Sequence, residues 1–134
     1  MAETFQLELV TPQRLVLREQ VTDAQIPARD GYIGALAGHA PLLSEMGSGF
    51  LSYTAAGRTY YMAVSGGFLE ILPDKVRILA DRAEKAEEID VTRAEAALKR
   101  AQERIASQTP GIDISRALNA LARAQARLDA AKHA

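Results

Sequence analysis

The sequence predicts an α+β protein, in which an N-terminal antiparallel β-sandwich of roughly eight to ten short strands precedes a C-terminal antiparallel two-helix hairpin. Two observations support this prediction. All seven aromatic residues and eight of the nine glycines precede residue 81, whereas residues 81–134 contain fifteen alanines and one glycine. The spacing of apolar residues also changes there, from two to three and four. We therefore expect two units, 1–86 and 87–134.

Short alternating segments define the first unit. Phe5-Gln6-Leu7-Glu8-Leu9 alternates apolar and polar residues, as a half-buried strand does. Turns at 55–57 and 73–75 predict two hairpins. Ser65-Gly66-Gly67 is expected to separate two strands, and Gly38 to Leu43 to form an ordered loop. The further expected strands are 15–17, 21–26 (ending at Pro27), 32–36, 50–54, 58–64, 68–72 and 76–80. Many short strands separated by turns are typical of a sandwich or a flattened barrel.

The second unit begins two helices in the same way. The pattern Ile-Asp-Val/Ile-Thr/Ser-Arg-Ala occurs at 89–94 and again, 23 residues later, at 112–117. Its aspartate can accept hydrogen bonds from free N–H groups of the first turn, and Ile89 can pack against Ala94. A turn about Thr109–Pro110 makes the helices antiparallel neighbours. The apolar stripes are Val91, Ala94, Leu98, Ala101 and Ile105, then Ile114, Ala117, Leu121, Ala124 and Leu128.

The composition excludes several classes of function. A net charge of −1 provides no bulk attraction to nucleic acid or to an anionic membrane. The absence of cysteine excludes disulfides and thiolate chemistry. No run of 18 apolar residues occurs, and the first four residues lack a basic segment followed by an apolar one. We therefore expect neither a membrane span nor a signal peptide.

Catalysis is not expected. His39 and His133 are the only histidines; His133 is expected in a frayed terminus, and His39 in a loop, bonded to backbone. No histidine–carboxylate cluster has the spacing of a metal site, and no glycine-rich phosphate loop occurs. We expect no enzyme activity and no metal.

The arginines of the hairpin are more informative. With a turn near residue 110, Arg93 faces the neighbourhood of Arg127, with Arg123 one turn away and Arg100 at the border. An arginine in the first turn also opposes the helix dipole by about 0.3–1 kcal/mol, which a bound anion would reverse. The alternative is ordinary surface pairing with the acidic residues Glu84, Glu87, Glu88, Asp90, Glu95 and Asp129.

A second set of cations lies on the last helix. Only Asp129 opposes them, so this face is either solvated or suited to an acidic partner. The set is Arg116, Arg123, Arg127 and Lys132.

Three motifs resemble one family. They are Gly34-Ala35-Leu36-Ala37-Gly38-His39-Ala40-Pro41-Leu42-Leu43, Ser65-Gly66-Gly67-Phe68-Leu69-Glu70, and Val76 to Ala83 followed by the 89–94 pattern. In this order they resemble the ε subunit of the F-type ATP synthase, the counterpart of the mitochondrial δ subunit. The similarity runs from about Phe5 to Leu128.

The resemblance implies a non-catalytic subunit of the central stalk that couples proton flow to ATP synthesis. The sandwich is expected to contact the γ subunit and the c-ring, and Tyr32 stands where some relatives have an acidic residue. The complex would be peripheral, at the cytoplasmic face of the bacterial cell membrane. The expected γ and c-ring contacts are Asp30, Gly31, Tyr32, His39, Pro41 and Leu42.

The resemblance also implies that the hairpin is a mobile regulator. Extended along γ, it would reach the α and β subunits through Arg116, Arg123, Arg127 and Lys132 and inhibit ATP hydrolysis. Folded, it binds ATP in some bacterial members. The matching residues are Glu84, Ile89, Asp90, Arg93, Ala94, Arg100, Arg123 and Arg127. Two alternatives remain open at this point: a free-standing ATP sensor, and a small enzyme that uses His39.

Overall fold

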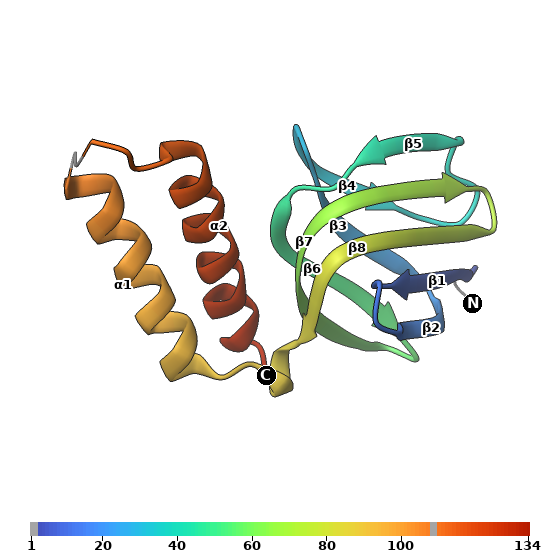
Figure 1. The fold of residues 1–134 in the computed structure, drawn as a ribbon. Helices are drawn as coiled ribbons and strands as arrows, with labels where there is room; N and C mark the ends of the chain where they lie inside the picture. Colours follow the sequence, from blue (N-terminus) through green and yellow to red (C-terminus); the bar gives the residue numbers. More distant parts are fainter. Residues whose placement is uncertain (1–2, 108–109) are drawn as a thin grey trace.

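The computed structural model describes residues 3–107 and 110–134, and within them it confirms the predicted α+β class (Figure 1). Thr109, in the expected turn between the helices, lies outside the described residues. The strands are β1 (Phe5–Val10), β2 (Leu15–Val21), β3 (Asp23–Ala28), β4 (Gly31–Ala35), β5 (Leu42–Glu45), β6 (Ser48–Ala55), β7 (Arg58–Leu72) and β8 (Lys75–Lys85). The helices are the short 3-10 helix η1 (Ala86–Glu88), α1 (Val91–Ser107) and α2 (Ile114–Ala131).

The strands follow the order β2-β1-β8-β7-β6-β3-β4, and β5 pairs with β7. Among the strands in the described ranges, neighbours run antiparallel except β1 and β8, which are parallel, with Gln6 opposite Lys75. This pairing places the first strand directly beside the last one. It joins segments about seventy residues apart, so no local pattern predicts it.

Strand β7 belongs to both layers of the sandwich. Its first half pairs with β6, its second half pairs with β5, and β8 follows it along both. Gly66 and Gly67, at φ of 69° and 97°, bend the strand instead of ending it. The prediction of two strands, 58–64 and 68–72, is therefore wrong. Glycine is required here because a Cβ on Gly67 would collide with the carbonyl oxygen of Leu79.

Two further strand boundaries were predicted wrongly. The end of the expected loop, Leu42 and Leu43, belongs to β5, because β7 offers these residues backbone partners at Ile71 and Glu70. Strand β3 also continues one residue beyond Pro27.

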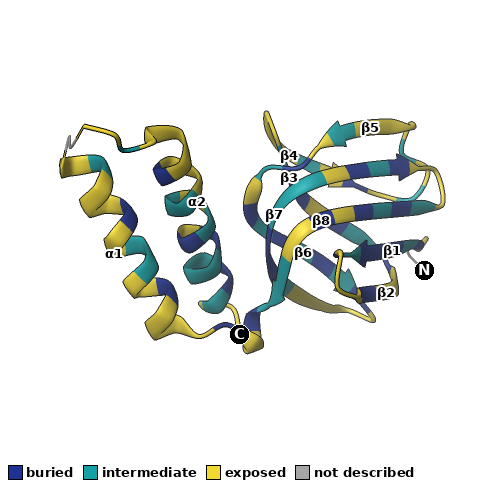
Figure 2. Cartoon of the chain, in the orientation of Figure 1, coloured by how far each residue is buried: buried dark blue, intermediate teal, exposed yellow. Residues whose placement is uncertain are grey.

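The core lies between the two layers. Leu9, Ile78 and Leu69 stand opposite one another on β1, β8 and β7, and all three are fully buried. Their sequence neighbours point outward, as the alternation predicts. Figure 2 shows buried residues alternating with exposed ones along these strands.

A carboxylate on the outer face joins three strands. Glu8 of β1 accepts a hydrogen bond from Arg18 of β2 (3.1 Å) and another from Arg77 of β8 (3.2 Å). The hydrogen bond from Arg18, with the positive charges of Arg18, Arg77 and Lys75, outweighs the opposing effect of burial and lowers the pKa of Glu8. The ionised carboxylate therefore stabilises the β2-β1-β8 edge.

The same outer face also carries exposed apolar residues. Phe68 of β7 stands opposite Leu79 of β8, and each is about half exposed. Leu43 on β5 is 73% exposed, and Leu15 on β2 is 47% exposed. We call these four residues the apolar strip.

The hairpin packs against the other side of the sandwich through α2, which lies between α1 and the strands (Figure 1). The alanines of the predicted stripes are buried, at Ala94, Ala101, Ala117 and Ala124. A second buried pair on α2, Ala126 and Ala130, was not predicted; Ala130 joins Ala63 and Ile89 in a small core. Alanine at these positions allows α2 to approach the strands closely.

The C-terminus is held against the sandwich. The imidazole of His133 stacks on the ring of Tyr61, with centroids 4.0 Å apart and planes inclined by 15°. Phe50 lies 5.8 Å from the same imidazole. The expectation that His133 lies in a frayed terminus is therefore wrong.

Gly67→Ala should destabilise the sandwich by about 2–5 kcal/mol, because it combines strain at positive φ with a steric collision. Gly57→Ala is the matched control: its φ is 79°, but nothing lies within 4 Å of the added Cβ. It should lose only about 1–2 kcal/mol. Urea unfolding of the isolated chain measures the free energy of unfolding of both variants. Equal losses would contradict the claim that a side chain at residue 67 collides with β8.

Glu8→Gln should lower the free energy of unfolding at pH 7. Since the folded protein lowers the pKa of Glu8, the stabilisation is present above the ordinary value of 4.5 and is lost as pH falls through the folded value. The difference between the variant and the wild type should therefore shrink in acid. Urea unfolding at a series of pH values measures this, and a difference that stays constant from pH 7 to pH 3 would refute it.

Candidate functional site

Both α-helices begin with the predicted aspartate cap. The Asp90 carboxylate accepts a hydrogen bond from the backbone N–H of Arg93 (3.0 Å), and Asp113 does the same for Arg116 (3.0 Å). Each cap satisfies a free donor of the first turn. The repeated sequence pattern therefore sets the start of each helix and places an arginine in each first turn.

Ile89 attaches the start of the hairpin to the sandwich. It is 9% exposed and packs in the small core with Ala63 of β7 and Ala130 of α2. The first turn of α1 and the last turns of α2 therefore meet the same part of the sheet.

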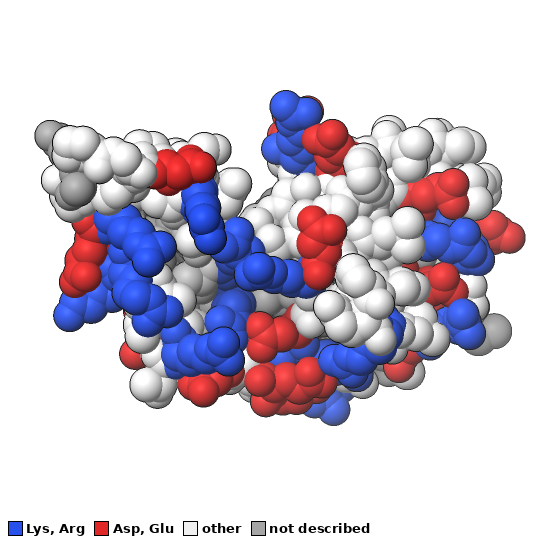
Figure 3. All heavy atoms as spheres, in the orientation of Figure 1, with Lys and Arg blue, Asp and Glu red and all other residues white. Residues whose placement is uncertain are grey.

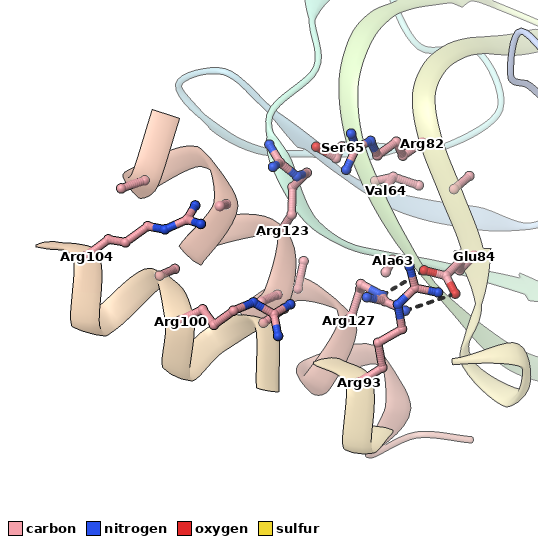
Figure 4. A pocket seen from close by; sticks show the side chains of 17 residues that line it. Ala63, Val64, Ser65, Arg82, Glu84, Arg93, Arg100, Arg104, Arg123 and Arg127 are labelled. Atoms are coloured by element: carbon pink, nitrogen blue, oxygen red, sulfur yellow. Dashed lines mark hydrogen bonds and ion pairs between the residues drawn. The ribbon is translucent and has the colours of Figure 1, made fainter. Parts of the chain in front are cut away.

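A cavity of about 470 Å³ lies between α1, α2 and strands β7 and β8 (Figure 4). This volume falls within the usual range of small-molecule sites. Its walls consist mostly of small residues and arginines. The small residues leave space, and the arginines supply positive charge. The lining residues are Ala63, Val64, Ser65, Arg82, Ala83, Glu84, Arg93, Ala97, Arg100, Ala101, Arg104, Ala117, Ala120, Arg123, Ala124, Ala126 and Arg127.

The cavity is strongly positive. Among the described residues that line it, six are arginines and one, Glu84, is acidic. Figure 3 shows basic side chains gathered over the helices and at the junction with the sandwich. The arginines are Arg82, Arg93, Arg100, Arg104, Arg123 and Arg127.

Within the described ranges, Arg127 is the one arginine of this group with a carboxylate within 4 Å. Its Nε lies 2.7 Å from Oε1 of Glu84, and its Nη2 donates to Oε2 over 3.5 Å. Other acidic residues pair elsewhere: Glu88 with Arg14, and Asp129 with Lys132. Neutralisation by surface pairs therefore accounts for one of the six positive charges.

The positive potential acts on Arg123. Burial, followed by the charges of Arg82 and Arg116, lowers the pKa of Arg123 from its ordinary value. The guanidinium group stays protonated, because arginine titrates far above neutral pH. A phosphate placed among these groups would relieve their repulsion and accept charge-assisted hydrogen bonds.

Of the predicted ATP-binding residues, five line the cavity: Glu84, Arg93, Arg100, Arg123 and Arg127. Ile89, Asp90 and Ala94 do not. Asp90 caps α1, Ile89 attaches it to the sheet, and Ala94 is fully buried.

Sequence reasoning missed two arginines of the cavity. Arg104 lies one helical turn beyond Arg100, so the periodicity could have identified it. Arg82 precedes Glu84 by two residues on β8 and therefore shares its face. Arg82 could have been identified by extending the alternation of the expected strand 76–80 to the end of β8.

The four cations predicted to contact the α and β subunits do not lie together in this structure. Arg123 and Arg127 line the cavity, whereas Arg116 is exposed and Lys132 pairs with Asp129 over 3.7 Å. The folded hairpin therefore does not present all four to a partner.

The residues predicted to contact γ and the c-ring lie in two places. Asp30 and Gly31 are exposed at the β3–β4 turn, and the Tyr32 hydroxyl accepts a hydrogen bond from the Phe50 N–H (3.1 Å). His39 precedes β5, before the exposed Pro41 and Leu42.

His39 makes a backbone contact. Its Nδ1 lies 2.6 Å from the carbonyl oxygen of Ala40, as expected for a loop histidine. In the part of the chain that the structure describes, no group of three or more His, Cys, Asp or Glu residues could hold a metal ion. No helix in that part is both long and apolar enough to cross a bilayer.

A β-sandwich followed by a two-helix unit defines a class of ATP synthase subunit. Residues 4–86 match the family model "ATP synthase, Delta/Epsilon chain, beta-sandwich domain", and residues 87–132 match "ATP synthase, Delta/Epsilon chain, long alpha-helix domain". The chain belongs to this family.

Curated relatives narrow the family to its epsilon chains. The chain is 52% identical to the ATP synthase epsilon chain of Koribacter versatilis, over 82% of this chain and 78% of the relative. It is 56% identical to that of Solibacter usitatus, over 76% of each. The predicted resemblance to the epsilon subunit of the bacterial F-type ATP synthase, a subunit of the central stalk, is confirmed.

Solved structures agree with the fold. A chain from the Euglena gracilis mitochondrial ATP synthase, in an assembly described as OSCP/F1/c-ring, superposes with a TM-score of 0.83 at 28% identity, covering 97% of this chain and 82% of that chain. A chain from the Tetrahymena thermophila central stalk and c-ring superposes with a TM-score of 0.56 at 11% identity, covering 98% and 96%, and supports the fold alone.

Proposed function

We propose that the folded hairpin of this epsilon-family chain binds ATP in the arginine cavity, and that the hairpin inhibits ATP hydrolysis by the synthase when it leaves the sandwich. The observation that carries the proposal is the charge of the cavity. Six guanidinium groups surround it with one carboxylate among the described lining residues, so a triphosphate is the natural counter-ion.

ATP would act by distinguishing the folded hairpin from the extended one. The cavity needs walls from α1, α2 and β8, so it exists only while the hairpin is folded on the sandwich. A ligand shifts an equilibrium only toward states that it binds better. At 100 times its dissociation constant, ATP would stabilise the folded form by about 2.7 kcal/mol.

The extended hairpin would expose the cations of α2. Arg123 and Arg127 face the cavity in the folded form, and extension would free them, with Arg116 and Lys132, to contact acidic surfaces of the α and β subunits. One set of arginines therefore cannot bind ATP and the catalytic head together. This competition would link ATP supply to inhibition.

The sandwich would provide the permanent attachment to the rotor. The apolar strip gathers exposed large apolar residues on one face of the sandwich, as protein contacts do, and we assign it to the γ subunit. Asp30, Gly31 and Tyr32 at the β3–β4 turn, with His39, Pro41 and Leu42, would contact γ and the c-ring.

In this assignment the chain couples proton flow to ATP synthesis without catalysing a reaction itself. It would lie at the cytoplasmic face of the bacterial membrane, held there by the complex. The Euglena relative comes from an assembly that contains F1 and the c-ring, which supports these partners.

Arg93→Ala and Arg127→Ala should each weaken ATP binding to the isolated chain by about 1.5–3 kcal/mol, the contribution of a hydrogen bond to a charged group. Calorimetric titration measures the affinity. Arg29→Ala is the matched control, because Arg29 pairs with Glu45 on the surface away from the cavity. Unaltered affinity in both cavity variants would falsify the ATP site.

Deleting residues 109–134 should relieve inhibition of ATP hydrolysis and leave ATP synthesis intact in the reassembled complex. The deletion removes α2 and its cations, whereas the sandwich with the apolar strip remains. ATP hydrolysis and proton-driven ATP synthesis are measured on membranes that contain either the deleted or the full chain. Loss of assembly or of ATP synthesis would show that α2 is needed for coupling.

A further inference from the structure

The cavity has two ends that differ in charge. At one end Glu84 pairs with Arg127, beside Arg93 at the start of α1 (Figure 4). At the other end Arg82 projects from β8 beside Ser65, its partner on β7, and extends toward the space that Arg123 of α2 also faces. No carboxylate lies within 4 Å of Arg82 or Arg123 among the described residues.

Arg82 differs from the other cavity arginines in its support. Arg93, Arg100 and Arg104 belong to α1, and Arg123 and Arg127 belong to α2, so all five move with the hairpin. Arg82 belongs to the sheet. An anion shared by Arg82 and Arg123 would therefore join the sandwich to the hairpin.

We propose that Arg82 and Arg123 form a subsite for the terminal phosphate of a nucleoside triphosphate, and that this contact makes ligand binding depend on docking of the hairpin. The inference rests on the proposed ATP site. Of the three phosphates of the nucleotide, the terminal one carries the most negative charge. This end of the cavity has two cations without a carboxylate. At the other end Glu84 offsets part of the charge of Arg127 and Arg93, and its carboxylate suits the hydroxyl and amino donors of a nucleoside.

Arg82 and Arg123 have opposite effects on docking of the hairpin with and without a bound anion. Without an anion the two guanidinium groups repel each other across the junction; burial, and then the charges of Arg82 and Arg116, lower the pKa of Arg123. With a phosphate between them, each donates charge-assisted hydrogen bonds and the repulsion is removed. Arg82 would thus oppose docking in the free protein and favour it in the complex.

The test uses the full-length chain with ATP and ADP as ligands. Arg82→Ala should weaken ATP binding roughly tenfold to a hundredfold, as for the loss of a hydrogen bond to a charged group. ADP binding should change much less, because ADP lacks the third phosphate. Arg82→Lys should recover part of the ATP affinity, since it keeps the charge. Arg58→Ala is the control: it removes an arginine of β7 that stacks over Tyr60, outside the cavity, and should change neither affinity.

Docking is followed separately through His133. Its imidazole stacks on Tyr61 only while the hairpin is folded, so ring-current shifts of its proton resonances report the docked state. In ligand-free Arg82→Ala the shifted signal should be as strong as in the wild type, or stronger. A merely structural role for Arg82 predicts a weaker signal.

The outcomes separate the two proposals. Wild-type chain that does not bind ATP overturns the proposed site and the subsite together. Wild-type binding that Arg93→Ala weakens, but Arg82→Ala does not, overturns the subsite alone. Equal losses of ATP and ADP affinity in Arg82→Ala, or loss of the stacked His133 signal without ligand, also overturn the subsite.

Discussion

Close approach of α2 to the sandwich depends on alanine at the points of contact. Ala130 of α2 meets Ala63 of β7 in a small core, and Ala126 is buried beside it. A larger side chain at any of these positions would push the helix outward and open the cavity. The same choice limits the apolar area that docking removes from water, and hydrophobic stabilisation scales with that area. The contact is therefore close but weakly stabilised, which would suit the proposed release of the helix pair from the sandwich.

Electrostatic repulsion works against this docking. Six arginines converge on a cavity in which Glu84 is the acidic residue among those described, and Glu84 is already paired with Arg127. Such an arrangement is poor for stability alone, and sequences usually break a stability rule where a site requires it. An anion turns the unfavourable charge into charge-assisted hydrogen bonds. The position of the hairpin would then depend on the supply of that anion.

Strands β7 and β8 connect the arginine cavity with the apolar strip. Ala63 to Ser65, Arg82 and Glu84 form the sandwich wall of the cavity, and Phe68 and Leu79 on the same two strands belong to the apolar strip. The bend at Gly66 and Gly67 separates these parts, so the β7–β8 strand pair belongs to both layers of the sandwich. Glu8 stabilises the neighbouring edge through Arg18 and Arg77. The same strand pair thus carries the surface that we assign to a partner and the wall against which the helical hairpin packs.

Local sequence patterns were enough to predict the alternating strands, the aspartate caps, and the grouping of Arg93, Arg100, Arg123 and Arg127. These follow from strand and helix periodicity and from the chemistry of free N–H groups. Only the packed structure settled the parallel pairing of β1 with β8, the continuity of β7 and the stacking of His133 on Tyr61. Each brings together residues far apart in the chain, and such contacts depend on which sheet edges and helix faces meet once the core has packed.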